Sequence, residues 1–177
     1  MSGNAHIAPG PEVQALEDFV LVGEVGCGKT ALMKALLRDD SELRKTQAAE
    51  FHPHNVVDTP GEFSVRPAYY GALLSTVVEI DTIVYVQPAN NTRFSLPAGL
   101  LQVYPNKRVI GVISKADLPD ANIDRARRIL RESAIQEPYF VTSVVTNDGV
   151  DQLRSYLVSL RANPSDTVPK SAVCGAA

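Results

Sequence analysis

The stretch LVGEVGCGKTALMKALL, residues 21–37, decides the fold, because it places three glycines, a lysine and a threonine directly after an apolar run. Its residues 23–30 fit the phosphate-loop pattern G-x-x-x-x-G-K-[ST]. We expect a buried strand before the loop, over residues 18–23, and an amphipathic helix after it, over residues 29–38. A glycine turn that merely opens a helix is the alternative. The flanking strand and helix favour a nucleotide site over that alternative.

Each residue type in this loop has a physical reason to hold phosphate. Glycines have no Cβ, so the backbone can turn sharply and its N–H groups can face an anion, at the positive end of the following helix. A lysine then brings charge to the β- and γ-phosphates, and a threonine hydroxyl can bind Mg²⁺. The predicted nucleotide-binding residues of the loop are Gly23, Glu24, Val25, Gly26, Cys27, Gly28, Lys29 and Thr30.

A second feature, DTPG at residues 58–61, ends the predicted strand over residues 55–61. The Asp58 carboxylate at a strand end can hold the water shell of a metal ion, and Gly61 can offer its N–H to a γ-phosphate. Aspartate, proline and glycine are also ordinary turn residues, so this feature alone would indicate no more than a turn.

Two further features suit a guanine base. Asp117, in SKAD at residues 114–117, can accept hydrogen bonds from guanine N1–H and the 2-amino group, neither of which adenine offers. Lys115 can lay its aliphatic stem along the base. In TSV, residues 142–144, a backbone N–H near Ser143 and Val144 can reach guanine O6. Taken singly, a solvated lysine–aspartate pair and plain strand core would explain these residues.

The order and spacing of the four features carry more weight than any one of them. Each lies at the carboxyl end of a predicted strand, where α/β folds bind their ligands. In this the chain resembles a small GTPase of the phosphate-loop class. The resemblance implies a three-layer α/β fold with a mostly parallel six-stranded sheet and one antiparallel strand, which we place at AAEF, residues 48–51.

The resemblance also implies two residues that switch with the nucleotide. Thr46 is the candidate for a second Mg²⁺ ligand, and Glu62 stands where Ras-like GTPases place the glutamine that orients water. Glu62 can act as a general base or face solvent. Arg44, Arg66 and Arg93 lie in expected loops, with no arginine finger assigned. The predicted catalytic residues are thus Lys29, Thr46, Gly61 and Glu62, and the predicted metal ligands are Thr30, Thr46 and Asp58.

The segments KTQA, DTPGE and TSVVTNDGVD together resemble the EutP/PduV family of small GTPase-like proteins, over about residues 19–160. The resemblance implies a cytoplasmic bacterial protein that works with a microcompartment for ethanolamine or propanediol. It also implies a shell or enzyme partner. Members of this family are described as GTPases, as acetate kinases or as accessory proteins that dock to shells.

Composition sets the outer limits. The 177 residues, 45% apolar and 21% charged, suit one globular domain over residues 18–161, with a flexible leader over residues 1–17 and a tail over residues 162–177. The net charge of −3 gives no case for nucleic-acid binding, and no apolar run is long enough for a bilayer. Two cysteines indicate a reducing compartment. His52 and His54 share a strand face, but an ordinary turn explains them better than a metal.

Three functions therefore remain open at this stage. The first is Mg²⁺-dependent binding of GTP and GDP, with slow hydrolysis and a switch over residues 58–66; ATP is possible in place of GTP. The second is phosphoryl transfer to acetate, which rests on the resemblance alone. The third is a nonenzymatic adaptor that keeps the nucleotide fold as a scaffold, against which the intact lysine, both threonines and Asp58 argue.

Overall fold

The computed structural model describes residues 16, 18–38, 50–52, 56–58, 80–97, 99–102 and 106–162. For residues 50–52, 56–58, 102 and 162 it describes the backbone alone. The sequence AYYGALLSTVVE, residues 68–79, predicts a helix, but this segment lies outside the described residues, as do Thr46, Gly61, Glu62 and His54.

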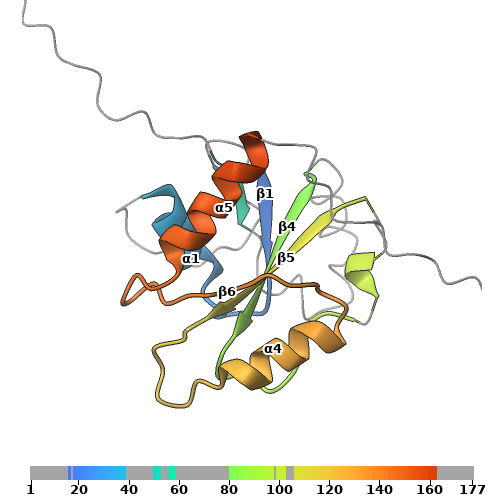
Figure 1. Cartoon of the computed structure of the whole chain (residues 1–177), viewed down its shortest axis with the longest axis vertical. Helices are drawn as coiled ribbons and strands as arrows, with labels where there is room; N and C mark the ends of the chain where they lie inside the picture. Colours follow the sequence, from blue (N-terminus) through green and yellow to red (C-terminus); the bar gives the residue numbers. More distant parts are fainter. Residues whose placement is uncertain are drawn as a thin grey trace, which may run out of the picture.

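One mostly parallel sheet forms the centre of the molecule (Figure 1). Its six strands run in the order β2-β3-β1-β4-β5-β6. Neighbours pair in parallel except β2, which is antiparallel to β3. The strands are β1 (Phe19–Val22), β2 (Glu50–His52), β3 (Val56–Asp58), β4 (Thr82–Pro88), β5 (Arg108–Ser114) and β6 (Tyr139–Val141). The prediction of an α/β fold with a mostly parallel sheet is confirmed.

Helices cover both faces of this sheet, which makes three layers (Figure 1). Helix α1 (Lys29–Leu37) and helix α5 (Val150–Ala162) pack together with β1, β4 and β5 around one apolar core. Helix α4 (Ile123–Glu132) covers the other face and contributes Ala126 and Leu130 to a second core. Every residue of β1 and β4 is buried, as strands covered on both faces require.

Helix limits follow from local chemistry. Helix α4 begins after Asn122, whose side-chain oxygen accepts a hydrogen bond from Arg125 N at 2.9 Å, an N-cap. Helix α1 ends at Leu37, and its C-cap Arg38 takes the left-handed conformation. Its buried apolar residues are Leu32, Met33 and Leu36. The spacing of the leucines in the sequence predicts Leu32, Leu36 and Leu37 toward the sheet, but Leu37 is only partly buried and Met33 takes its place.

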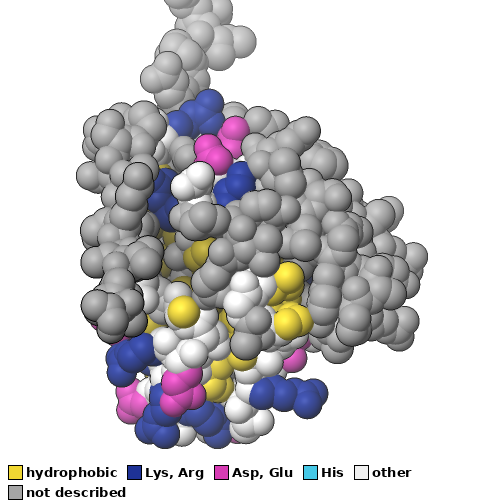
Figure 2. All heavy atoms as spheres, turned by 90° about the vertical axis from the view of Figure 1, so that its right-hand side faces the viewer, with side chains coloured by type: hydrophobic (Ala, Val, Ile, Leu, Met, Phe, Trp, Pro, Cys, Tyr) yellow, Lys and Arg dark blue, Asp and Glu magenta, His cyan; other side chains and the backbone are white. Residues whose placement is uncertain are grey.

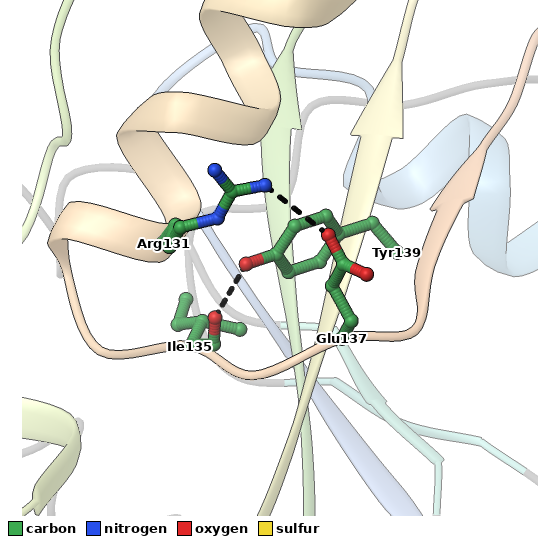
Figure 3. Close-up of polar contacts among 4 residues, drawn as sticks. All are labelled: Arg131, Ile135, Glu137 and Tyr139. Carbon is green, nitrogen blue, oxygen red and sulfur yellow. Dashed lines mark hydrogen bonds and ion pairs between the residues drawn. The ribbon is translucent and has the colours of Figure 1, made fainter.

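The turn between α4 and β6 is fixed by Tyr139 (Figure 3). Its hydroxyl donates a hydrogen bond to Ile135 O at 2.6 Å, while the Arg127 guanidinium lies 6.0 Å from its ring centroid. Figure 3 also shows the pair between Arg131 Nη2 and Glu137 Oε1 at 3.3 Å. That pair is largely exposed, so it adds little stability. The buried tyrosine therefore ties the edge strand β6 to the turn that follows α4.

The segment between β4 and β5 has no regular structure among its described residues except a short 3-10 helix, η2 (Leu100–Gln102). This agrees with the sequence, where proline, asparagine and glycine interrupt any periodicity. On the face that Figure 2 shows, acidic and basic side chains lie intermixed on the described atoms, mainly at the lower end, where Figure 1 places α4. None of the helices in the described ranges is long and apolar enough to cross a membrane.

The described chain begins inside the predicted leader. Leu16 is 2% exposed and belongs to the core between α1 and α5. Arg161 of α5 holds this segment, donating a hydrogen bond to Leu16 O at 2.9 Å and pairing with Asp18 at 3.5 Å. Leu16 is therefore part of the folded core, two residues before the predicted domain boundary.

Candidate functional site

The phosphate loop follows β1 and leads into α1. Gly26 and Gly28 have φ of +74° and +101°, which L side chains rarely adopt. A Cβ on Gly23 would lie 2.6 Å from Val86 O, so only glycine allows β4 to pass this closely. The strand, loop and helix thus have the form that the sequence pattern predicted, consistent with a phosphate-loop NTPase fold.

Lys29 is the first residue of α1 and is 6% exposed. Its ammonium donates to Gly23 O and Glu24 O, both at 3.0 Å, so its stem crosses back under the loop. The third contact is Cys27 Sγ at 3.8 Å. Sulfur is a weak acceptor. One N–H of the buried Lys29 ammonium therefore makes only a weak hydrogen bond, and an anion in the loop would be a stronger acceptor for it.

The loop after β5 contacts the phosphate loop directly. Ser114 is 6% exposed, and its hydroxyl donates to Cys27 O at 2.7 Å. Lys115 follows with φ of +58°. Burial raises the pKa of Cys27, and the charge of Lys115 opposes that rise only slightly. Asp117 is exposed to solvent. The hydrogen bond from Ser114 to Cys27 thus connects the segment that carries the predicted base-binding residues to the predicted phosphate loop.

The loop after β6 carries the last of the predicted nucleotide-binding residues. Ser143 is buried, and its hydroxyl accepts hydrogen bonds from Val145 N and Thr146 N, both at 3.2 Å. Ala116 N donates to Thr142 O at 3.2 Å, which ties this loop to the one after β5. Val144 is 41% exposed at the loop tip. Three of the four predicted features therefore meet at one end of the sheet.

The predicted metal ligands are only partly described. Thr30 is the second residue of α1. The backbone of Asp58 ends β3 and pairs in register with Leu21 of β1, two residues before the phosphate loop begins. His52 ends β2. Over the described residues, no group of three or more histidine, cysteine, aspartate or glutamate side chains could hold a metal ion. A metal here would depend on hydroxyl and phosphate oxygens as well.

Burial governs the titratable groups beside the loop. Burial raises the pKa of the Cys27 thiol, against a smaller lowering by Lys29. Burial likewise raises the pKa of Tyr85 to about 12, against the lowering effect of its hydrogen bond with Ser95 at 2.8 Å. Both groups stay neutral at pH 7, so neither adds a charge beside that of Lys29.

Sequence reasoning missed one wall of this site, the loop after β4. Asn91 Nδ2 donates a hydrogen bond to Glu24 Oε1 of the phosphate loop. Asn90 Nδ2 donates to Asp120 Oδ2 at 3.3 Å, beyond the loop after β5. Two consecutive asparagines, one residue after the end of a buried strand, were the available signal for this loop, since the carboxyl end of a parallel strand faces ligands.

Known proteins are similar in sequence to most of this chain. Residues 16–159 match the PduV-EutP family, described as ethanolamine utilisation - propanediol utilisation. "Probable acetate kinase EutP" of Salmonella typhimurium is 42% identical over 156 residues, 88% of this chain and 98% of that protein. Its Escherichia coli (strain K12) namesake is 43% identical over 145 residues, 82% and 91% of the two chains. "Propanediol utilization protein PduV" of Citrobacter freundii is 32% identical over 143 residues, 80% and 93% of the two chains. This chain therefore belongs to the PduV-EutP family.

Proposed function

We propose that this protein binds guanosine triphosphate with Mg²⁺ and hydrolyses it slowly, in the service of a bacterial microcompartment for ethanolamine or propanediol. The observation that carries the nucleotide part is the buried ammonium of Lys29 under a glycine loop, with one donor turned to a poor acceptor. The microcompartment part is supported by the family to which the chain belongs.

The residues present fit a magnesium–nucleotide complex. A bound triphosphate with Mg²⁺ would supply the transferable phosphoryl group and neutralise part of its charge. The N–H groups of residues 23–28 would bind phosphate oxygens, and Lys29 would add its charge. Thr30 would hold the metal, with Asp58 and Thr46 as the further proposed ligands. Glu62 is proposed to accept a proton from the attacking water or to face solvent, and Gly61 to offer its N–H to the γ-phosphate.

Guanine selection is proposed to rest on Asp117, and its loss is a direct test. We expect Asp117→Asn to cut the preference for GTP over ATP by about 10- to 100-fold, because an amide cannot accept both guanine donors. The preference is measured from dissociation constants of fluorescent GTP and ATP analogues with Mg²⁺. Asp124→Asn, which removes another exposed carboxylate in the first turn of α4, is the matched control. An unchanged preference in Asp117→Asn would remove the guanine assignment.

Phosphoryl transfer to acetate is the second candidate, favoured by the names of the Salmonella and Escherichia relatives. In that function acetate, in place of water, would receive the γ-phosphoryl group. We expect acetyl phosphate to accumulate with ATP or GTP, Mg²⁺ and acetate, and to stop accumulating in Lys29→Ala. Coupled detection of acetyl phosphate as its hydroxamate measures this. Nucleotide hydrolysis at the same rate with and without acetate, and no hydroxamate, would leave the GTPase function alone.

A further inference from the structure

The phosphate loop contains a carboxylate, Glu24, which is unexpected in a cradle for an anion. A carboxylate beside a triphosphate costs electrostatic energy unless its charge is held elsewhere or offset. Glu24 is also beside the one cation of the loop, since its own carbonyl oxygen lies 3.0 Å from Lys29 Nζ. A freely rotating Glu24 side chain would therefore be able to pair with Lys29 and compete with phosphate for it.

The structure places Glu24 elsewhere, because Asn91 Nδ2 donates a hydrogen bond to Glu24 Oε1. The direction of the Asn91 amide is fixed by its other end. Its Oδ1 accepts from Thr92 N at 2.6 Å and from Arg93 N at 3.3 Å. Because two backbone N–H groups require the oxygen on that side, the amide NH₂ must face Glu24.

The loop that carries Asn91 is held on both sides. Ala89 N donates to Ser114 O, and Asn122 N donates to Ala89 O, each at 2.8 Å. Gln87, which is fully buried, donates from Nε2 to Arg93 O at 3.3 Å. Asn91 therefore stands on backbone that is joined to the proposed base-binding loop, and its position relative to the phosphate loop is fixed.

We infer that Asn91 is a positioning residue for triphosphate binding, which holds the Glu24 carboxylate on the loop after β4 and so leaves Lys29 for the phosphates. The inference rests on the proposed nucleotide binding. Asn91 is expected to touch neither nucleotide nor metal. Its effect should pass entirely through Glu24, which separates this role from general support of the fold.

Two titratable groups among the described residues feel the Glu24 charge. They are Cys27 in the same loop and Tyr85 of β4, whose pKa values are raised mainly by burial and further by Glu24. Both groups therefore stay neutral at pH 7, and Lys29 of α1 lies at the Glu24 carbonyl oxygen. If nucleotide binding depends on pH between pH 5.5 and 8 only in an Asn91 variant, the cause would therefore be the carboxylate introduced at residue 91 or the Glu24 carboxylate that Asn91 no longer holds.

The test replaces Asn91 with an isosteric carboxylate. Asn91→Asp removes the donor and sets a like charge against Glu24, so we expect binding of a fluorescent GTP analogue with Mg²⁺ to weaken about tenfold or more at pH 8. The deficit should shrink towards pH 5.5, because two close carboxylates share a proton there. Glu24→Gln should bind up to about threefold more tightly than wild type, and Asn91→Asp with Glu24→Gln should return to within about threefold of it.

Asn91→Ala keeps the inference testable if Asn91→Asp does not fold, because it frees Glu24 without adding charge. It should weaken binding several-fold, and Glu24→Gln should again restore it. A loss that persists in either double variant would overturn the inference, as that pattern belongs to a structural role. Wild-type affinity in Asn91→Asp would overturn it as well. If wild type and all variants failed to bind, the proposed function would fall together with the inference.

Discussion

Lys29→Ala is expected to abolish measurable binding of the magnesium–triphosphate complex, with the dissociation constant rising more than about 100-fold. The wild-type ammonium is already positioned by two loop carbonyls at 3.0 Å, so almost no ordering is left for the nucleotide to impose on it. Its third donor meets only Cys27 Sγ at 3.8 Å, and a phosphate oxygen would replace that contact with a charge-assisted hydrogen bond. Alanine removes both the charge and the donor.

Isothermal titration with GTP and Mg²⁺ measures this loss. Lys34→Ala is the matched control, because it removes the same charge from the same helix but from a position outside the loop. Thermal unfolding without nucleotide should show that both variants remain folded. Unaltered affinity in Lys29→Ala would mean that the glycine loop is only a turn opening α1, and the adaptor function would then take precedence.

The phosphate loop could be predicted from sequence because its chemistry is local. Glycines at residues 23, 26 and 28 and the lysine after them lie within eight residues, and each requirement acts on the backbone beside it. Strand β1 was predictable for the same reason, since all four of its residues are apolar. The buried face of α1 was harder to predict, because whether Met33 or Leu37 is buried depends on how α5 packs against the helix.

The contacts that join the loops could not be predicted, because they connect residues far apart in the chain. Ser114 meets Cys27 across 87 positions, and Asn91 meets Glu24 across 67. Neither pair has a sequence pattern, since each depends on where parallel strands end relative to one another. Thr46, Gly61 and Glu62 stay predictions, as they lie outside the described residues, and the domain limits at residues 18 and 161 are likewise untested.

Among alanine substitutions of the described glycines, Gly149→Ala is expected to cause the largest loss of stability, about 4 kcal/mol or more. Gly149 has φ of +69° and accepts a hydrogen bond from Leu153 N at 3.1 Å, at the start of α5. A Cβ there would lie 1.9 Å from Val141 O and 3.0 Å from Val141 C, far inside any contact distance. Those atoms are backbone at the end of β6, so no side chain can turn aside.

Relief of this clash would have to move either β6 or α5, and both are fixed by packing. Val150 and Leu153 of α5 lie in the core, and Ser143 N donates to Asp148 O at 3.0 Å in the adjoining loop. Gly26→Ala separates the clash from the strain, because φ there is +74° and nothing lies within 4 Å of a Cβ. It should lower the free energy of unfolding by only about 1 kcal/mol, which is the strain of an alanine in the left-handed conformation. Urea unfolding of both variants measures the difference. Equal losses would show that the junction of β6, the serine loop and α5 relaxes freely, and that the contact at Val141 does not constrain it.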